Sequence, residues 1–248
     1  MDKEKEIVTK TNKFQSKNIK VDSGTIMEKV TFIPYEKESV RNFIKSMIIA
    51  LEARDTYTKN HSARVALFSE EIAKNLSLSS ETTEIVRIAG LLHDIGKIGV
   101  SDKILLKEGL LNEHELELIE EHPSISEDIC RPINFFNPIL PIIRGHHERI
   151  DGSGYPDHKE GQDIHIGARI ISVADSFDAL ISNRSYRHAL SLDKVVSILR
   201  SGAGNQWDQK VVETFVDNLD TERLFNILQQ TSKSEKAKTL ASGTIFEI

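Results

Sequence analysis

Histidine and aspartate side chains interrupt an apolar stretch of this sequence, where an isolated charge is costly. In "LLHDIGKIG" (91–99), His93, Asp94 and Lys97 lie within a run of leucines and isoleucines. A buried charge destabilises a protein unless it is paired or neutralised. The stretch therefore requires a partner that accepts both an imidazole nitrogen and a carboxylate oxygen.

Five further residues of the same two types lie on helix faces that should be buried: His61, His122, His146, His147 and Asp175. One such histidine is usually a hydrogen-bonded core residue, but seven candidates on five helical segments indicate metal binding. Imidazole and carboxylate ligands without sulfur suit Fe, Mn, Zn, Co or Ni. Seven ligands are more than one tetrahedral zinc ion uses, and no His-Glu-x-x-His motif is present. They suit two six-coordinate ions that share a bridging carboxylate, and Asp94 is the natural bridge.

The elements that must position these residues are predicted to be helices. From Ser39, apolar residues recur at three- and four-residue spacing, beginning with Val40, Phe43 and Ile44. Ser80 is expected to cap a helix, and Asn112 with Glu115 forms the pattern of a capping box. Period-2 alternation is not sustained, so a sheet is not expected. The helices are expected at about 58–76, 80–92, 112–123, 138–147, 165–183, 191–200 and 208–218.

The domain expected from this pattern covers residues 39–220, between a short N-terminal extension (1–38) and a C-terminal tail (221–248). A net charge of −6 argues against binding to nucleic-acid polymers, which usually requires a basic face. Cys130 is the only cysteine, which excludes an internal disulfide and favours the reducing cytoplasm. No stretch approaches the roughly 20 apolar residues of a membrane span, and the N-terminus does not resemble a secretory signal.

Five motifs occur in an order that resembles the HD-GYP subfamily of the HD phosphohydrolase superfamily, over roughly residues 40–220. They are "HDIGK" (93–97), "EHP" (121–123), "HHERIDGSGYP" (146–156), "SVADSFDAL" (172–180) and "RSYR" (184–187). The resemblance implies an all-α HD-domain helical bundle with the additional C-terminal HD-GYP helices. It also implies a bacterial enzyme that hydrolyses cyclic di-GMP at a cluster of two or three metal ions, often iron or manganese. The metal ligands it implies are His61, His93, Asp94, His122, His146, His147 and Asp175.

The resemblance also implies residues that contact the substrate. Lys97 resembles the family's lysine near the scissile phosphate and is, with Asp94, the expected catalytic residue. Gly154, Tyr155 and Pro156 form the signature turn, in which the tyrosine ring can stack on a guanine. Arg184 and Arg187 are expected to bind a phosphate. Many relatives have proline where Ser185 stands, and most carry a receiver or sensor domain. Residues 1–38 are too short for one, so regulation is expected to be missing or to come from a homodimer or a separate protein.

The function expected is a phosphodiesterase that opens cyclic di-GMP mainly to linear pGpG, with slow further cleavage to GMP. Relatives with three metals have an acidic residue four positions before the histidine that matches His61, where this chain has Tyr57. Asp55 and Glu52 are expected to project away from His61, so two ions, Fe or Mn, are predicted. One alternative is a receptor that binds a cyclic dinucleotide without cleaving it, although none of the seven ligands is lost. The other is an HD phosphohydrolase that acts on another nucleotide or cyclic dinucleotide. The "GSGYP" turn argues against triphosphates but does not choose among cyclic dinucleotides.

Overall fold

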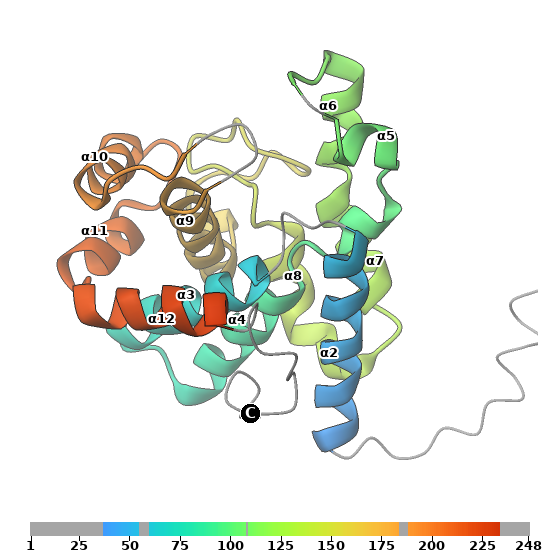
Figure 1. Ribbon diagram of the computed structural model, residues 1–248, viewed down its shortest axis with the longest axis horizontal. Helices are drawn as coiled ribbons and strands as arrows, with labels where there is room; N and C mark the ends of the chain where they lie inside the picture. Colours follow the sequence, from blue (N-terminus) through green and yellow to red (C-terminus); the bar gives the residue numbers. More distant parts are fainter. Residues whose placement is uncertain (1–36, 55–59, 108, 184–187, 234–248) are drawn as a thin grey trace, which may run out of the picture. The chain divides into compact units, whose positions relative to one another are not determined.

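The structure, a computed structural model, describes residues 37–54, 60–107, 109–183 and 188–233 and builds them from helices (Figure 1). No β-strand occurs within these ranges, where only one isolated bridge joins Ala203 and Trp207. The predicted all-α fold is thus confirmed. The α-helices are α2 (Lys37–Arg54), α3 (His61–Asn75), α4 (Ser80–Leu92), α5 (Asp102–Leu105), α6 (Glu113–Glu120), α7 (His122–Cys130), α8 (Leu140–Arg144), α9 (Ile166–Ile181), α10 (Leu192–Gly202), α11 (Gln209–Asp217) and α12 (Thr221–Lys233). Short 3₁₀ helices are η1 (Ile95–Gly99), η2 (Asn134–Ile139) and η3 (Gly161–Asp163).

Helix α3 packs against both α4 and α9 and forms the centre of the bundle. A Cβ added to Gly90 would lie 2.8 Å from the Cα atom of Ala66, so α3 and α4 approach at backbone distance there. On the other side of α3, the rings of Phe68 and Phe177 meet edge to face at 5.1 Å. Figure 1 shows α10 and α11 on one side of this centre and α5–α7 on the other. This packing brings together the start of α3, the end of α4 and the middle of α9.

Local side-chain hydrogen bonds set two of the helix starts. The predicted capping box is confirmed, because Asn112 and Glu115 each accept a hydrogen bond of 2.9 Å from the other's backbone N–H. The cap of α4 is Ser79, whose hydroxyl accepts from the N–H of Thr82, and not Ser80 as predicted. Ser79 has the extended backbone of a cap residue, whereas Ser80 is already helical.

The chain divides into two units, Met1–Lys37 and Glu38–Ile248. Residues 221–233, which were expected to begin a tail, form helix α12 and pack against α3. Leu224 and Ile227 are buried at helical spacing, and this amphipathic pattern explains why a further helix forms after residue 220. None of the helices in the described ranges combines the length and the apolarity needed to cross a membrane.

Candidate metal centre

The candidate ligands form two groups that have Asp94 in common. One group contains Asp94, His122, His146 and His147, and the other contains His61, His93 and Asp94. Within each group the candidate ligand atoms all lie within 4.8 Å of one another. Asp175 reaches the second group through an oxygen 3.3 Å from Nε2 of His61. All seven residues proposed from the sequence are therefore brought to one place.

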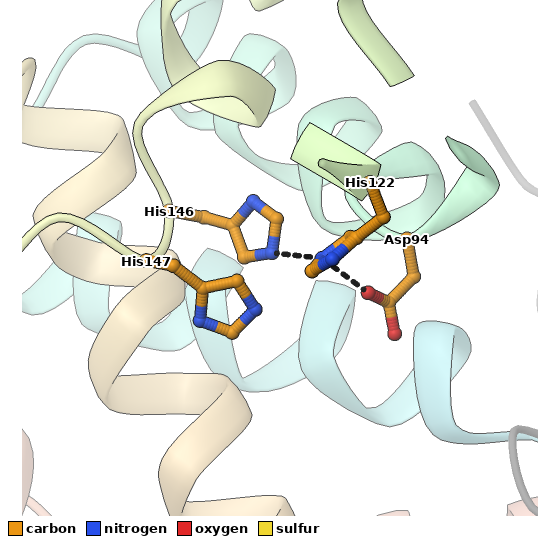
Figure 2. A group of neighbouring side chains, drawn as sticks. All are labelled: Asp94, His122, His146 and His147. Atoms are coloured by element: carbon orange, nitrogen blue, oxygen red, sulfur yellow. Dashed lines mark hydrogen bonds and ion pairs between the residues drawn. The ribbon is translucent and has the colours of Figure 1, made fainter. Parts of the chain in front are cut away.

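Asp94 lies at the junction of α4 and η1, and its two carboxylate oxygens face different groups. Its Oδ1 atom is 3.2 Å from Nε2 of His122, a contact that is drawn as a dashed line in Figure 2. Its Oδ2 atom is 3.4 Å from Nε2 of His93 and 3.8 Å from Nε2 of His61. The side chain is buried. A carboxylate with one oxygen toward each group has the arrangement of a bridging ligand.

Three histidines are oriented in the same way, by a carbonyl three residues earlier in the chain. The Nδ1 atoms lie 2.9 Å from the oxygen of Gly90 for His93, 2.7 Å from that of Ile119 for His122, and 2.7 Å from that of Ile143 for His146. Each carbonyl lies in the last turn of a helix, where regular intrahelical donors run out. Because a carbonyl only accepts hydrogen bonds, Nδ1 carries the proton and the neutral ring presents its lone pair at Nε2.

His61 is oriented differently, by a side chain. Its Nδ1 lies 2.7 Å from Oδ2 of Asp178, a carboxylate that is 1% exposed. Arg64 donates to both oxygens of Asp178, at 2.5 Å from Nε and 3.0 Å from Nη2. Sequence reasoning missed Asp178, although it lies three residues after Asp175 and therefore on the same side of α9.

The unpaired atoms of the site fit a cation. Among the described residues, Nε2 of His93 and Oδ1 of Asp94 are buried without a hydrogen-bond partner. The Nε2 atoms of His122 and His146 face each other at 3.3 Å (Figure 2). Since both rings hold their proton on Nδ1, two lone pairs point at each other there. Nitrogen and carboxylate oxygen donors of this kind suit Fe, Mn, Zn, Co or Ni, so the cluster is able to bind metal.

The histidine pKa values favour the neutral form for most of these ligands. Burial lowers the pKa of His93 and of His146, and it lowers the pKa of His147 to about 3. Burial also lowers the pKa of His61, but hydrogen bonds to Asp175 and Asp178 outweigh it and raise this pKa to about 9. Metal-free His61 is thus protonated at neutral pH, whereas His93, His146 and His147 are ready to bind a cation.

The two carboxylates of the site are ionised. Burial alone would raise the pKa of Asp94, but the positive charge of Lys97 holds it well below its usual range. Burial acts the same way on Asp175, and its hydrogen bond with His61 lowers the pKa of that carboxyl. Lys97 donates to Oδ2 of Asp94 at 2.6 Å and keeps a partly exposed side chain. The ammonium is therefore placed at the edge of the cluster.

The Gly154–Pro156 turn packs directly on the histidine pair. A Cβ on Gly154 would lie 2.5 Å from the oxygen of His147 and 2.4 Å from the nitrogen of Arg149, so only glycine fits. The ring of Tyr155 stacks on that of His147 at 4.8 Å between centroids. Burial raises the pKa of the Tyr155 phenol, which is neutral. One face of the tyrosine thus supports a candidate ligand, a contact that the sequence did not predict.

Two charged residues on either side of the histidine pair hold the loop that follows this turn. Glu148 is buried and accepts from the backbone N–H groups of Asp157 at 2.7 Å and Lys159 at 3.1 Å. Arg144 binds the carboxylate of Asp157 and also that of Glu127 on α7. The loop is therefore tied to both sides of the site. The predicted phosphate-binding residues Arg184 and Arg187 lie outside the described residues.

The chain before His61 differs from what the sequence predicted for Glu52. Helix α3 begins at His61, and Asn60 has a left-handed backbone with φ 61°, so the helix of His61 does not continue to residue 57. Glu52 does not project away from the start of α3, because its carboxylate accepts from the N–H of Asn60 at 2.7 Å. Asp55 and Tyr57 lie outside the described residues.

The chain is similar in sequence to HD domain proteins and to phosphodiesterases of cyclic dinucleotides. The sequence model of the HD domain family matches residues 45–211. A 3′3′-cGAMP-specific phosphodiesterase 3 of Vibrio cholerae is 41% identical over 60% of this chain and 32% of its own length. A cyclic di-GMP phosphodiesterase of Thermotoga maritima is 40% identical over 66% of this chain and 45% of its own length. The chain thus spans less than half the length of these curated relatives.

A solved structure supports the fold. The crystal structure of a cyclic GMP-AMP-specific phosphodiesterase from V. cholerae superimposes with a TM-score of 0.63. The superposition covers 83% of this chain and 55% of the solved chain, and the two sequences are 19% identical. At this identity the likeness shows a shared helical fold.

Proposed function

This chain belongs to the HD domain family, and on that premise we propose that it is a metal-dependent phosphodiesterase that hydrolyses cyclic di-GMP. The resemblance of its motifs to HD-GYP proteins is confirmed by the family match and the relatives. The two curated relatives are named as phosphodiesterases for cyclic dinucleotides. We place the activity in the cytoplasm, in line with a single buried cysteine, Cys130.

The observation that carries the proposal is the position of Asp94 between two groups of ligands. Its Oδ1 faces His122 and its Oδ2 faces His93 and His61. We infer that each group holds one divalent ion and that Asp94 bridges them. Ligands of nitrogen and oxygen without sulfur are compatible with the iron or manganese that we propose.

The reaction joins a water oxygen to phosphorus and breaks the bond from phosphorus to a 3′ oxygen, which takes a proton. The seven candidate ligands would hold divalent ions, which when bound would lower the pKa of a bound water and would supply positive charge to the phosphate. Lys97 adds an ammonium at the edge of the cluster, where it stabilises charge that develops on the phosphate oxygens. Asp94 keeps that ammonium in place through their 2.6 Å contact.

The substrate contacts that we propose lie around the same centre. Tyr155 uses one ring face on His147 and offers its remaining edge and face to a guanine base. Gly154 and Pro156 shape the turn that holds this ring. Arg184 and Arg187 are proposed to bind phosphate. Relatives named for cyclic di-GMP and for cGAMP both match this chain, and guanine is common to the two substrates.

We propose linear pGpG as the main product. Because the two ligand groups share Asp94, they would serve one scissile phosphate at a time, and the constrained cyclic substrate would present its phosphate there. The linear product must rebind to be cut again, so cleavage to GMP should be slow. Chromatography over time should show pGpG accumulating before GMP, and equal rates for the two products would contradict this order.

The test compares metal-loaded wild-type protein with the double variant His93→Ala–Asp94→Ala, using cyclic di-GMP and chromatography of the products. The wild type should open the cycle, and the variant should be inactive because both groups lose a ligand. His114→Ala is the matched control, since His114 is exposed on α6, and it should keep full activity. Full activity in the double variant would refute the site. Tight binding by the wild type without turnover would instead support a receptor.

A further inference from the structure

We propose that Asp178, held by Arg64, selects the tautomer of His61 and thereby decides whether the His61–His93–Asp94 group binds its metal ion. This inference rests on the metal centre of the proposed function and adds a positioning residue to it. Asp178 touches none of the reacting groups in this proposal and acts only through His61.

The contrast among the histidines motivates the proposal. His93, His122 and His146 donate from Nδ1 to a carbonyl of their own helix region, three residues away. His61 instead meets Asp178 on α9, 117 residues further along the chain. The orientation of His61 thus depends on a side chain, which a single substitution can change.

The two carboxylates of α9 contact opposite nitrogens of His61. Asp178 lies 2.7 Å from Nδ1, and Asp175 lies 3.3 Å from Nε2. A carboxylate can only accept, so Asp178 keeps a proton on Nδ1. The Nε2 atom, which faces Asp94 and Asp175, is then the nitrogen whose lone pair is available to a metal ion.

Arg64 makes the arrangement sensitive to replacement of Asp178 by asparagine. Arg64 has only donors, and its shortest contact is 2.5 Å, from Nε to Oδ1 of Asp178. An asparagine at this position would turn its carbonyl oxygen toward that Nε. Its NH₂ group would then occupy the place of Oδ2 and point at Nδ1 of His61. In this orientation the NH₂ group lies 3.0 Å from the donor Nη2 of Arg64, whereas the reverse orientation would set it 2.5 Å from the donor Nε, so the first is the less repulsive of the two.

In Asp178→Asn the ring of His61 must therefore accept at Nδ1 and carry its proton on Nε2. The protonated Nε2 cannot bind a metal ion. We expect the association constant for the more weakly bound of the two metal ions to fall by about 10–100-fold. The metal content measured by elemental analysis after gel filtration should fall from about two ions per chain toward about one.

Removing Arg64 should reverse this loss. In the double variant Asp178→Asn–Arg64→Met, no donor fixes the amide, which is free to turn its oxygen toward Nδ1–H of His61. Metal content should return to about two ions per chain, and Arg64→Met alone should also keep it. If Asp178 had a purely structural role, the double variant would not regain metal. Its metal content would then be as low as that of Asp178→Asn or lower.

Asp208→Asn is the matched control. Asp208 is a second buried carboxylate that pairs with an arginine, Arg169, at 2.5 Å, but it caps α11 and meets no histidine. This variant should lose stability in thermal unfolding and keep its metal content. Asp178→Asn with full metal content, or a double variant that fails to regain the lost ion, would overturn the proposal.

A measurement on the wild-type chain covers the case in which Asp178→Asn does not fold. Nitrogen-15 NMR of histidine-labelled, zinc-loaded protein should show His61 protonated at Nδ1 and bound to zinc through Nε2. A proton on Nε2 with zinc at Nδ1 would overturn the proposal. If the wild type binds no metal ion at all, the proposed function fails as well, so the two failures are distinguishable.

Discussion

Replacing Gly96 by alanine should separate the two segments that carry Asp94 and His122. Gly96 lies in η1, two residues after Asp94, and packs against the start of α7. An added Cβ would lie 2.0 Å from the backbone oxygen of His122 and 2.5 Å from the backbone nitrogen of Ser126. Real Cβ contacts essentially never fall below 3.0 Å, so the backbones must move apart by about 1 Å.

This displacement is large compared with what a metal centre tolerates. Metal–ligand distances hold within about 0.2 Å, and Oδ1 of Asp94 is only 3.2 Å from Nε2 of His122. The shift would also disturb Ser126, which accepts from the N–H of Gly96 and donates to the carbonyl of His93, each at 2.8 Å. Overpacking of this kind costs about 1–3 kcal/mol, which lowers Tm by roughly 2–12 °C. Metal affinity should fall by at least about tenfold.

The assay is thermal unfolding of metal-free protein together with metal titration of Gly96→Ala. Gly99→Ala is the matched control in the same short helix, because the three atoms nearest to its Cβ all belong to the side chain of Ile125, the nearest at 3.0 Å. That side chain can turn aside, so metal content should stay at the wild-type level. A Gly96→Ala protein with wild-type Tm and wild-type metal affinity would refute the close approach of η1 and α7 and its role in the centre.

Three further predictions concern protons, the tyrosine and the arginines. Metal binding at pH 7 should release about one proton, because metal-free His61 has a pKa of about 9 and must become neutral to bind. The apparent affinity for metal should therefore rise up to about pH 9 and then flatten, and calorimetry in two buffers that shows no proton release would contradict this. Tyr155→Phe should keep the stacking on His147, whereas Tyr155→Ala should lose about 0.5–1.5 kcal/mol of stability in thermal unfolding; equal losses in both would point to the hydroxyl. Arg184→Glu or Arg187→Glu should weaken cyclic di-GMP binding by about 1.5–3 kcal/mol in equilibrium binding with metal content unchanged; parallel loss of metal would make the arginines part of the scaffold.

Much of the site was predictable because its ligands are polar residues in apolar surroundings. His93 and Asp94 within a run of leucines, and His146–His147 before a glycine-rich loop, stand out in the sequence alone. Helical spacing then gave the helices that carry them. The same reasoning missed Asp178, since a carboxylate that orients a ligand is indistinguishable in sequence from any aspartate on that helix.

Tertiary contacts explain where prediction from sequence failed. The helix of His61 was expected to start near residue 58, but the left-handed Asn60 begins it at His61 itself, and this changes the position of Glu52 relative to the site. Residues 221–233 were expected to belong to a C-terminal tail, yet they form α12, in which Leu224 and Ile227 are buried and which packs on α3. The packing of α12 depends on a helix distant in the chain, whereas the start of α3 depends on the backbone of Asn60 and on its contact with Glu52, eight residues earlier.

Elemental analysis of anaerobically purified wild-type protein, combined with chromatography of its products from cyclic di-GMP and a mixed-base analogue, tests the central claim most directly. The account predicts two ions of iron or manganese per chain, with opening of the cycle that is lost on chelation and regained when metal is returned. Cyclic di-GMP that stays intact in fully metal-loaded protein, or hydrolysis that persists after the metal is removed, would contradict it.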